Sequence, residues 1–296
     1  MKRRHALSLL AASALPASGK KRESPPIATN SYPWTTFYGR EKKPFPGHSD
    51  EIMGQVSQIG FQGYEPCVSR PSELAKMAPF LKKYGLEMRS LYTNSTLHEA
   101  TKVEQSMKHV LEVARAGKPL GLKIIVTNPS PIKWGSKEAK TDAQLKTQAA
   151  ALDELGAALV KEGVTLAYHN HDMELHHGAR EFHHMLTGTS PEVVKFCLDS
   201  HWIYRGCGNS EVALFDAVAH YYERVVELHL RQSQGGVWQE TFAMEGDIDY
   251  RRLFEFLNSK SIHPHLVLEQ AVEGRSPKTL DVQTAHAASY QALSRH

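Results

Sequence analysis

Four side chains that can bind a divalent metal ion follow apolar runs in the second half of the chain. They are His169, Asp199, His229 and Glu269, at intervals of 30, 30 and 40 residues. Two imidazoles and two carboxylates form a mixed nitrogen and oxygen site, which suits Mn²⁺, Co²⁺, Zn²⁺ or Fe²⁺ better than Mg²⁺. An ion that holds a carbonyl and a neighbouring hydroxyl stabilises the enediolate formed when the C–H bond between them loses its proton. The four residues therefore predict chemistry at a carbon next to a carbonyl group.

Further residues near these four could carry protons. His171 and His201 each lie two positions after a predicted ligand, and strand alternation would place them on the ligand's side if the strand continues. Histidine titrates near neutral pH, so we favour His171 as the acid or base, and Asp172 and Glu174 could orient these imidazoles. Glu269 could itself be a base, and Arg231 could contact a substrate hydroxyl or a developing oxyanion.

Residues that could bind a sugar lie close after the predicted strands. A tryptophan face can stack on a sugar ring, and a carboxylate can accept hydrogen bonds from hydroxyls. Each of these side chains could instead serve packing, a helix cap or a surface ion pair. The candidates are Trp34, Glu65, Trp134, Trp202, Trp238 and Glu240.

The elements that position these residues alternate between short β-like runs and helical stretches. Strands are predicted at 27–32, 63–65, 87–92, 123–127, 165–169, 195–199, 226–230 and 266–270. Amphipathic helices are predicted at 71–84, 101–116 and 143–162. This alternation predicts a single (β/α)8 TIM barrel, whose active site lies at the carboxyl ends of its strands. An open doubly wound sheet is the alternative, but no GxGxxG follows the first strand.

The composition excludes several classes of function. The chain has 296 residues, of which 41% are hydrophobic, and its 35 Lys and Arg nearly balance its 32 Asp and Glu. A net charge of +3 is too small to indicate nucleic-acid binding, and the three cysteines contain no CxxC pair for a thiolate zinc site. We expect a small-molecule carbohydrate as the partner, and the sequence leaves self-association open.

The N-terminal segment has the pattern of a secretory signal. Lys2-Arg3-Arg4 precede an apolar run over 6–15, followed by small and basic residues. The run is too short to span a bilayer, and the arginine pair also suggests the twin-arginine route. We therefore expect 1–22 to be a signal and spacer, 23–296 to be the barrel, and the protein to be exported to the periplasm or beyond. A disordered basic terminus is the alternative interpretation.

Several motifs at the predicted strand ends resemble a known family. They are Tyr-His-Asn-His-Asp at 168–172, Leu-Asp-Ser-His-Trp at 198–202, Leu-His-Leu-Arg at 228–231, Glu-Gly-Asp-Ile-Asp-Tyr at 245–250 and Leu-Glu-Gln at 268–270. With them, residues 27–290 resemble the xylose isomerase-like TIM-barrel superfamily, which includes sugar phosphate isomerases/epimerases and inosose dehydratases.

The resemblance implies a metal-dependent enzyme, and this sequence departs from the family's ligand pattern at one position. Many members bind the ion through Glu, Asp, His and Glu at the ends of strands five to eight, and here His169 replaces the first glutamate. Family epimerases use the two glutamates as paired proton carriers, so Glu269 would need His171 or His201 as its partner. The resemblance thus implies a sugar isomerase or epimerase acting next to a carbonyl on a free or oxidised (keto) sugar.

Other functions remain open at this stage. Loss of a β-oxygen from the same enediolate would make the protein a lyase or dehydratase acting on a ketosugar or keto-glycoside. A secreted sugar-binding module and an endonuclease IV-like phosphodiesterase are further alternatives. The nuclease would need more metal ligands and a basic groove, and the charge balance does not support such a groove.

Overall fold

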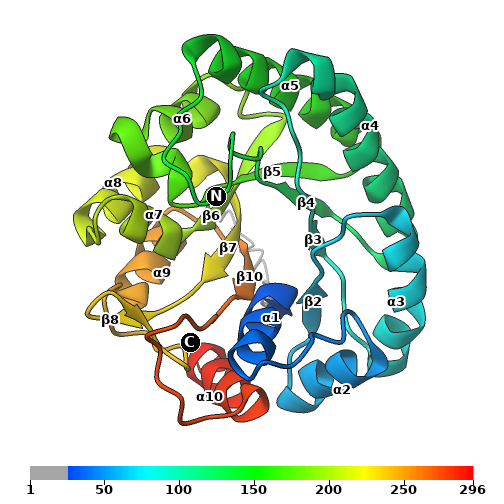
Figure 1. Ribbon diagram of the computed structural model, residues 1–296, viewed down its shortest axis with the longest axis vertical. Coiled ribbons are helices and arrows are strands. Elements are labelled where there is room, and N and C mark those ends of the chain that lie inside the picture. The colour runs from blue at the N-terminus through cyan, green and yellow to red at the C-terminus, as the bar shows by residue number, and fades with distance from the viewer. Residues whose placement is uncertain (1–25, 296) are drawn as a thin grey trace, which may run out of the picture.

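The computed structural model describes residues 26–295 and shows parallel strands surrounded by helices (Figure 1). The strands are β1 (Ala28–Asn30), β2 (Gly63–Glu65), β3 (Ser90–Tyr92), β4 (Ile124–Thr127), β5 (Thr165–His169), β6 (Val194–Asp199), β7 (Val225–Leu230) and β10 (His265–Leu268). They pair in the order β2-β1-β10-β7-β6-β5-β4-β3. Parallel bridges from Gly63 to Glu87 and from Cys67 to Tyr92 close the ring between β2 and β3. The predicted TIM barrel is confirmed.

The helices form an outer ring around the strands (Figure 1). The ring contains α2 (Asp50–Ile59), α3 (Pro71–Tyr84), α4 (Ala100–Gly117), α5 (Asp142–Lys161), α6 (His176–Thr187), α8 (Glu211–Tyr221), α9 (Tyr250–Ser259) and α10 (Val282–Ser294). Shorter elements are α7 (Ser200–Gly206), the 3₁₀ helices η1 (Lys118–Leu120), η2 (Met173–Leu175) and η3 (Tyr222–Arg224), and the hairpin β8 (Ser233–Gln234) with β9 (Val237–Trp238). The three helices predicted from periodicity agree with α3, α4 and α5 to within one residue at each end.

Helix α5 shows how local sequence produces these elements. Thr141 and Gln144 form a reciprocal capping box at its start, which satisfies backbone N–H groups that have no partner within the helix. The leucines at helical spacing, Leu152 and Leu155 among them, are buried against the barrel. Gly156 lets the helix approach the segment before β6 closely, because a Cβ there would lie 2.4 Å from the carbonyl oxygen of Val193.

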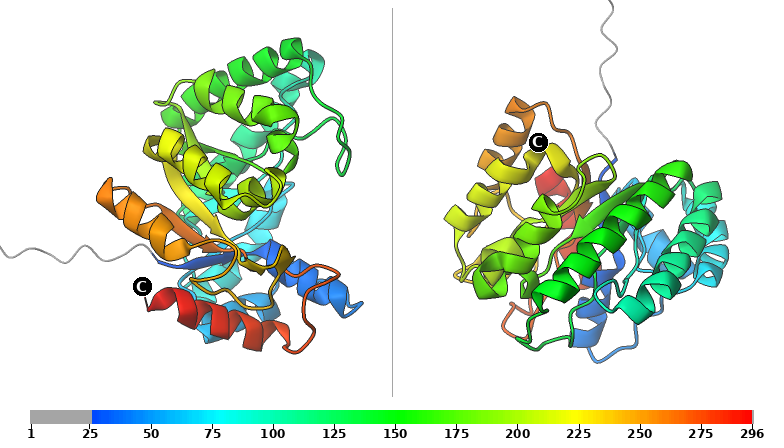
Figure 2. Two further views of the ribbon diagram at one scale, coloured as in Figure 1. Left: turned by 90° about the vertical axis from the view of Figure 1, so that its left-hand side faces the viewer. Right: turned by 90° about the horizontal axis from the view of Figure 1, so that it is seen from above.

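Helix α1 (Ser31–Arg40) continues directly from β1 at the carboxyl end of the barrel, where Figure 2 (left) also shows the loop between β4 and α5. The first strand is shorter than predicted because the Asn30 side chain caps this helix. Trp34 and Glu240, predicted to bind substrate, serve the packing of α1 instead. Trp34 is fully buried and its ring centroid lies 4.6 Å from that of His286. Glu240 is buried and forms an ion pair with Arg40.

No helix within residues 26–295 has both the length and the apolar character needed to cross a bilayer. The predicted signal and spacer, residues 1–22, lie outside the described residues.

Candidate active site

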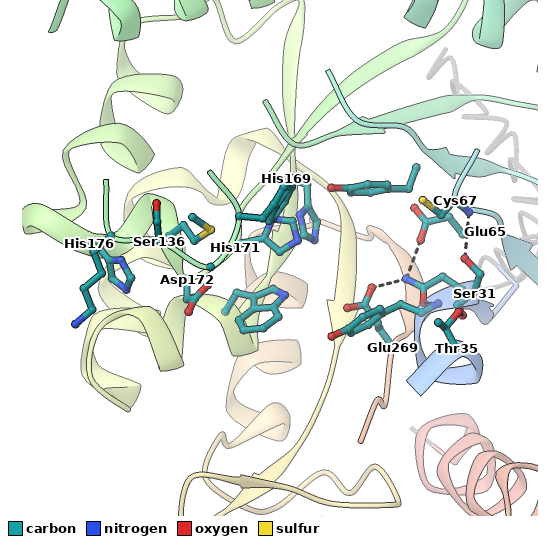
Figure 3. A pocket seen from close by; sticks show the side chains of 18 residues that line it. Ser31, Thr35, Glu65, Cys67, Ser136, His169, His171, Asp172, His176 and Glu269 are labelled. Atoms are coloured by element: carbon teal, nitrogen blue, oxygen red, sulfur yellow. Dashed lines mark hydrogen bonds between the residues drawn. The ribbon is translucent and has the colours of Figure 1, made fainter. Parts of the chain in front are cut away.

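A pocket of about 720 Å³ opens at the carboxyl end of the barrel (Figure 3). Its walls come from the β1–α1 junction, the ends of β2, β5 and β10, helix α7, and the long loop 128–141 between β4 and α5. The lining includes four of the predicted site residues outside the ligand set: Glu65, Trp134, His171 and Trp202. Pockets at this end of the barrel are where TIM-barrel enzymes place their chemistry.

The four predicted metal ligands lie close together at the floor of this pocket, where His169 and Glu269 line it and Asp199 and His229 lie behind them. Donor atoms of Asp199, His229 and Glu269 lie within 4.8 Å of one another. His169 Nε2 lies 3.7 Å from Asp199 Oδ2, and His229 Nδ1 lies 3.0 Å from Glu269 Oε2. Ligands held about 2.1 Å from one ion are separated by roughly 3–4 Å. The spacing therefore fits a single divalent ion.

Unpartnered polar atoms also indicate an ion. Both ring nitrogens of His169 and Oδ2 of Asp199 are buried and make no hydrogen bond to the described part of the chain. Asp199 Oδ1, by contrast, accepts a hydrogen bond from the Trp202 backbone N–H at the start of α7. Leaving a buried polar group unsatisfied costs roughly 1–3 kcal/mol, and a bound ion would remove that cost. The donor set thus fits a divalent metal.

The electrostatic balance of the floor favours a cation. Four carboxylates, those of Glu65, Asp199, Glu227 and Glu269, are buried there beside one guanidinium, that of Arg231. Burial raises the pKa of Asp199 to about 6, although Arg231 acts in the opposite direction. Burial and the neighbouring Glu65 raise the pKa of Glu227 to about 7. A divalent ion would compensate this crowding of negative charge.

His229 is held by carboxylates on both sides of its ring. Its Nε2 lies 3.1 Å from Glu65 Oε2 and 3.2 Å from Glu227 Oε1, while Nδ1 faces Glu269. Burial opposes a charge on this ring, but the Cys197 sulfur, Glu65 and Glu269 raise the pKa of His229 well above its usual value. The two carboxylates behind the ring fix its orientation, as partners of metal-bound histidines commonly do.

Sequence reasoning missed Glu227 and Asn30. Glu227 lies two positions before His229 on β7, so strand alternation could have identified it as facing the same side. Asn30 ends β1, a position that the barrel fold also marks as functional. Its Nδ2 donates to Glu65 Oε2 at 3.1 Å and to Glu269. Asn30 therefore orients the carboxylate of Glu269 toward the pocket.

His171 lines the pocket beside the ligand His169. Its backbone N–H donates to Glu174 Oε2 at 2.7 Å, so Glu174 positions it through the backbone. Its ring centroid lies 4.7 Å from that of His169 and 5.2 Å from that of Trp134. Burial, with the nearby His169, lowers the pKa of His171 to about 3. The imidazole is therefore neutral near pH 7 and is a weak base there.

His201 does not lie beside the pocket. Strand β6 ends at Asp199 and helix α7 begins at Ser200, so the alternation on which its prediction depended does not extend to it. Its Nε2 lies 2.9 Å from Ser233 Oγ, and its ring is buried. The side chain packs against the β8–β9 hairpin, away from the predicted ligands.

Arg231 and Trp238, which were predicted to contact substrate, do not line the pocket. Arg231 is fully buried, forms an ion pair with Glu269, and lies 3.8 Å from Asp199. Its guanidinium carbon lies 4.2 Å from the Trp238 ring centroid and 4.9 Å from that of Trp202. Trp238 covers Arg231 and does not line the pocket. Arg231 thus holds two of the predicted carboxylate ligands from behind the pocket wall.

Comparisons with known proteins agree with this fold. A model of the xylose isomerase-like TIM barrel matches residues 53–291. An inosose dehydratase from Clostridium perfringens is 24% identical over 249 residues, which cover 74% of this chain and 81% of the relative. A sugar phosphate isomerase/epimerase from Parabacteroides distasonis superposes with a TM-score of 0.72 at 13% identity, covering 94% of this chain and 98% of that one. The E. coli 3-keto-D-glucoside 4-epimerase YcjR superposes with a TM-score of 0.65 at 14% identity, covering 92% and 98%.

Proposed function

Because the chain belongs to the xylose isomerase-like TIM-barrel family, we propose that it is a divalent-metal-dependent sugar isomerase or epimerase. Its substrate would be a free or oxidised (keto) sugar that loses a proton next to its carbonyl. The observation that carries the proposal is the convergence of donor atoms from His169, Asp199, His229 and Glu269 at the pocket floor. Mn²⁺, Co²⁺, Zn²⁺ and Fe²⁺ suit this donor set.

The metal ion would supply the Lewis acidity that stabilises an enediolate. Glu269 is the best placed base, because it is a predicted ligand that also lines the pocket. Burial opposes its ionisation, but Arg231 and His229 hold the pKa of Glu269 well below its usual value, so the carboxylate is charged. Asn30 and Arg231 fix both of its oxygens, which restricts how it can meet a substrate C–H bond.

The second proton carrier decides the outcome of the reaction. His169 is buried, and burial together with the nearby His229 lowers its pKa to about 3, so it cannot replace the charge of a glutamate. A symmetric exchange between carboxylates at positions 169 and 269 is therefore unavailable. We assign the second role to His171, which is not one of the four predicted ligands and borders the floor on the side of His169.

Elimination is the second candidate outcome. The pairing of one carboxylate with an imidazole treats the two faces of the substrate differently, which suits removal of a proton and departure of a β-oxygen. The curated relative described above is named a dehydratase, which supports the same alternative. The product then separates the two candidates, since elimination forms an unsaturated ketone and isomerisation or epimerisation does not.

The test combines metal loading with proton exchange. Protein loaded with Mn²⁺ is incubated in D₂O with a panel of ketoses and keto-glycosides, and NMR follows deuterium incorporation and product formation. We expect deuterium exchange into at least one ketose with the wild-type protein. His229→Ala and Glu269→Gln should each lose metal retention or turnover, while circular dichroism shows that their fold is intact. Glu245→Gln, at an exposed carboxylate, is the matched control. Full activity in both site variants would reject the assignment.

We also propose that the protein is exported. The support is the basic head and apolar run within residues 1–22.

A further inference from the structure

We propose that the pocket has a second binding region that holds a ring substituent attached to the reacting sugar. We call it the outer arm, and it consists of Trp134, Ser136, Lys137, Asp172 and His176. The substrate class that follows is a glycoside whose second group is another sugar ring or an aromatic ring. The inference rests on the proposed function for the reacting end of that substrate.

The outer arm lies apart from the carboxylates of the pocket. Figure 3 shows Ser136 and His176 at one end, Glu65 and Glu269 at the other, and His169 between them. All of these residues line one continuous pocket. A sugar held over Glu269 would therefore direct a substituent past the imidazoles toward the outer arm.

The pocket is large for a single sugar ring. Sites of roughly 300–1,000 Å³ enclose drug-sized ligands, and this pocket measures about 720 Å³. A pyranose at the floor would leave the outer arm unfilled. The volume therefore provides room for a second ring.

The wall of the outer arm is anchored to helix α6. The carbonyl oxygen of Lys137 lies 2.9 Å from His177 Nε2, and that of Lys140 accepts a hydrogen bond from Arg180. The buried Lys140 ammonium also donates to Glu181 at 2.6 Å. The loop 128–141 is longer than most connections in such barrels, and loops of this length are commonly functional. Its fixed attachment indicates a preformed surface.

The chemistry of the outer arm suits the face of a ring. Among residues 26–295, the exposed large hydrophobic side chains are Tyr32, Trp134, Val160 and Val212, and the first two line this pocket. Trp134 is 51% exposed, and its ring is perpendicular to that of His171, at an interplanar angle of 87°. Its uncovered indole surface can stack on a flat apolar ring, while Lys137 and Asp172 can meet peripheral hydroxyls.

The test compares probes that differ in the second group. Isothermal titration of the Mn²⁺-loaded protein would measure Kd for methyl β-D-glucoside, phenyl β-D-glucoside and cellobiose. We expect at least one ring-bearing probe to bind about fivefold or more tightly than the methyl glucoside. Preference for the phenyl probe identifies an aromatic substituent, and preference for cellobiose identifies a second sugar.

Variants assign that preference to the outer arm. Trp134→Ala should remove the ratio between ring-bearing and methyl probes, and Trp134→Phe should retain most of it. Val212→Ala removes an exposed hydrophobic side chain from α8 and should leave the ratio unchanged. Failure of both ring-bearing probes to bind, equal Kd values for all three probes, or a ratio that survives Trp134→Ala would overturn the proposal.

This outcome is separable from that of the proposed function. Deuterium exchange into small ketoses tests the pocket floor alone, whereas the ratio of Kd values tests the outer arm alone. Exchange without a preference for ring-bearing probes would reject the outer arm and leave the enzyme assignment standing. A preference for ring-bearing probes without exchange into any ketose would reject the enzyme assignment and leave the outer arm standing.

Discussion

The substitution Glu227→Gln tests how the buried carboxylates serve the metal site. Glu227 is fully buried, is not one of the four predicted ligands, and contacts Nε2 of His229 at 3.2 Å. Glutamine keeps the size of the side chain and removes its charge. Losing the partner of a metal-bound histidine typically lowers metal affinity 10- to 100-fold. Because Glu65 also contacts Nε2, we expect the lower end of that range, about tenfold.

The effect on the metal-free protein should be small. Above pH 7, ionising a carboxyl whose pKa is raised from 4.5 to about 7 costs the fold up to about 3 kcal/mol, and the substitution removes this cost. It also weakens the hydrogen bond to the charged His229 ring, because a neutral amide oxygen replaces the carboxylate; hydrogen bonds to charged groups are worth about 1.5–3 kcal/mol. The two changes oppose each other, so we expect the free energy of unfolding of the metal-free variant to stay within about 1 kcal/mol of the wild type.

Two assays measure these quantities. Competition with a chromophoric chelator at pH 8 gives the Kd for Mn²⁺ or Zn²⁺, and urea unfolding in EDTA gives the stability of the metal-free protein. An unchanged metal Kd would refute the reasoning, because His229 would then not depend on its buried partner. A fall in metal-free stability of 3 kcal/mol or more would show that Glu227 is a packing residue instead.

Three further predictions concern other parts of the chain. Burial lowers the pKa of His286 from 6.5 to about 4, so the free energy of unfolding should fall by about 3 kcal/mol as the pH drops from above 6.5 to 4. Urea unfolding at several pH values would measure this decrease, and His286→Phe should remove it. Ala179 has a φ of 56°, a backbone conformation that strains a residue with a Cβ, so Ala179→Gly should raise the free energy of unfolding by about 0.5–1 kcal/mol. The control is Ala150→Gly at an exposed position within α5, which should lower the free energy of unfolding by a similar amount. Mass spectrometry of the protein secreted by a bacterial host should find its N-terminus after Ala14 or a few residues later, and recovery of the intact chain from the cytoplasm alone would contradict export.

The sequence predicted the strand ends well because parallel strands with buried faces carry a strong local signal. Strands β2 and β5 begin and end where the alternation predicted them, and His169, Asp199 and His229 occupy the last residues of their strands or lie next to them. Since all strands of a TIM barrel run in the same direction, placing residues at strand ends also places them together.

Side-chain directions after the strand ends were harder to predict. His201 was assigned to the pocket by extending β6, but Asp199 caps a helix that begins at the next residue. Trp34 was predicted to bind substrate close after the first strand, whereas α1 starts at Ser31 and turns its ring toward α10. These outcomes depend on where a helix begins, and propensities fix such boundaries only to within a few residues.

Contacts between distant segments could not be predicted at all. The ion pair of Arg40 with Glu240 joins residues 200 positions apart, and nothing local in either segment indicates it. The outer arm likewise depends on the attachment of the loop 128–141 to α6 through Lys140 and Glu181. Such pairings follow from the closed ring of helices, which a single sequence does not specify residue by residue.

The central claim is that His169, Asp199, His229 and Glu269 bind one divalent ion at the barrel mouth. Crystals of the full chain soaked in Mn²⁺, with anomalous scattering recorded at the manganese edge, measure this directly. The account predicts one strong peak about 2.0–2.4 Å from a donor atom of each of the four side chains. No peak at the pocket floor, or a peak bound only by Glu65 and Glu227 behind His229, would contradict it.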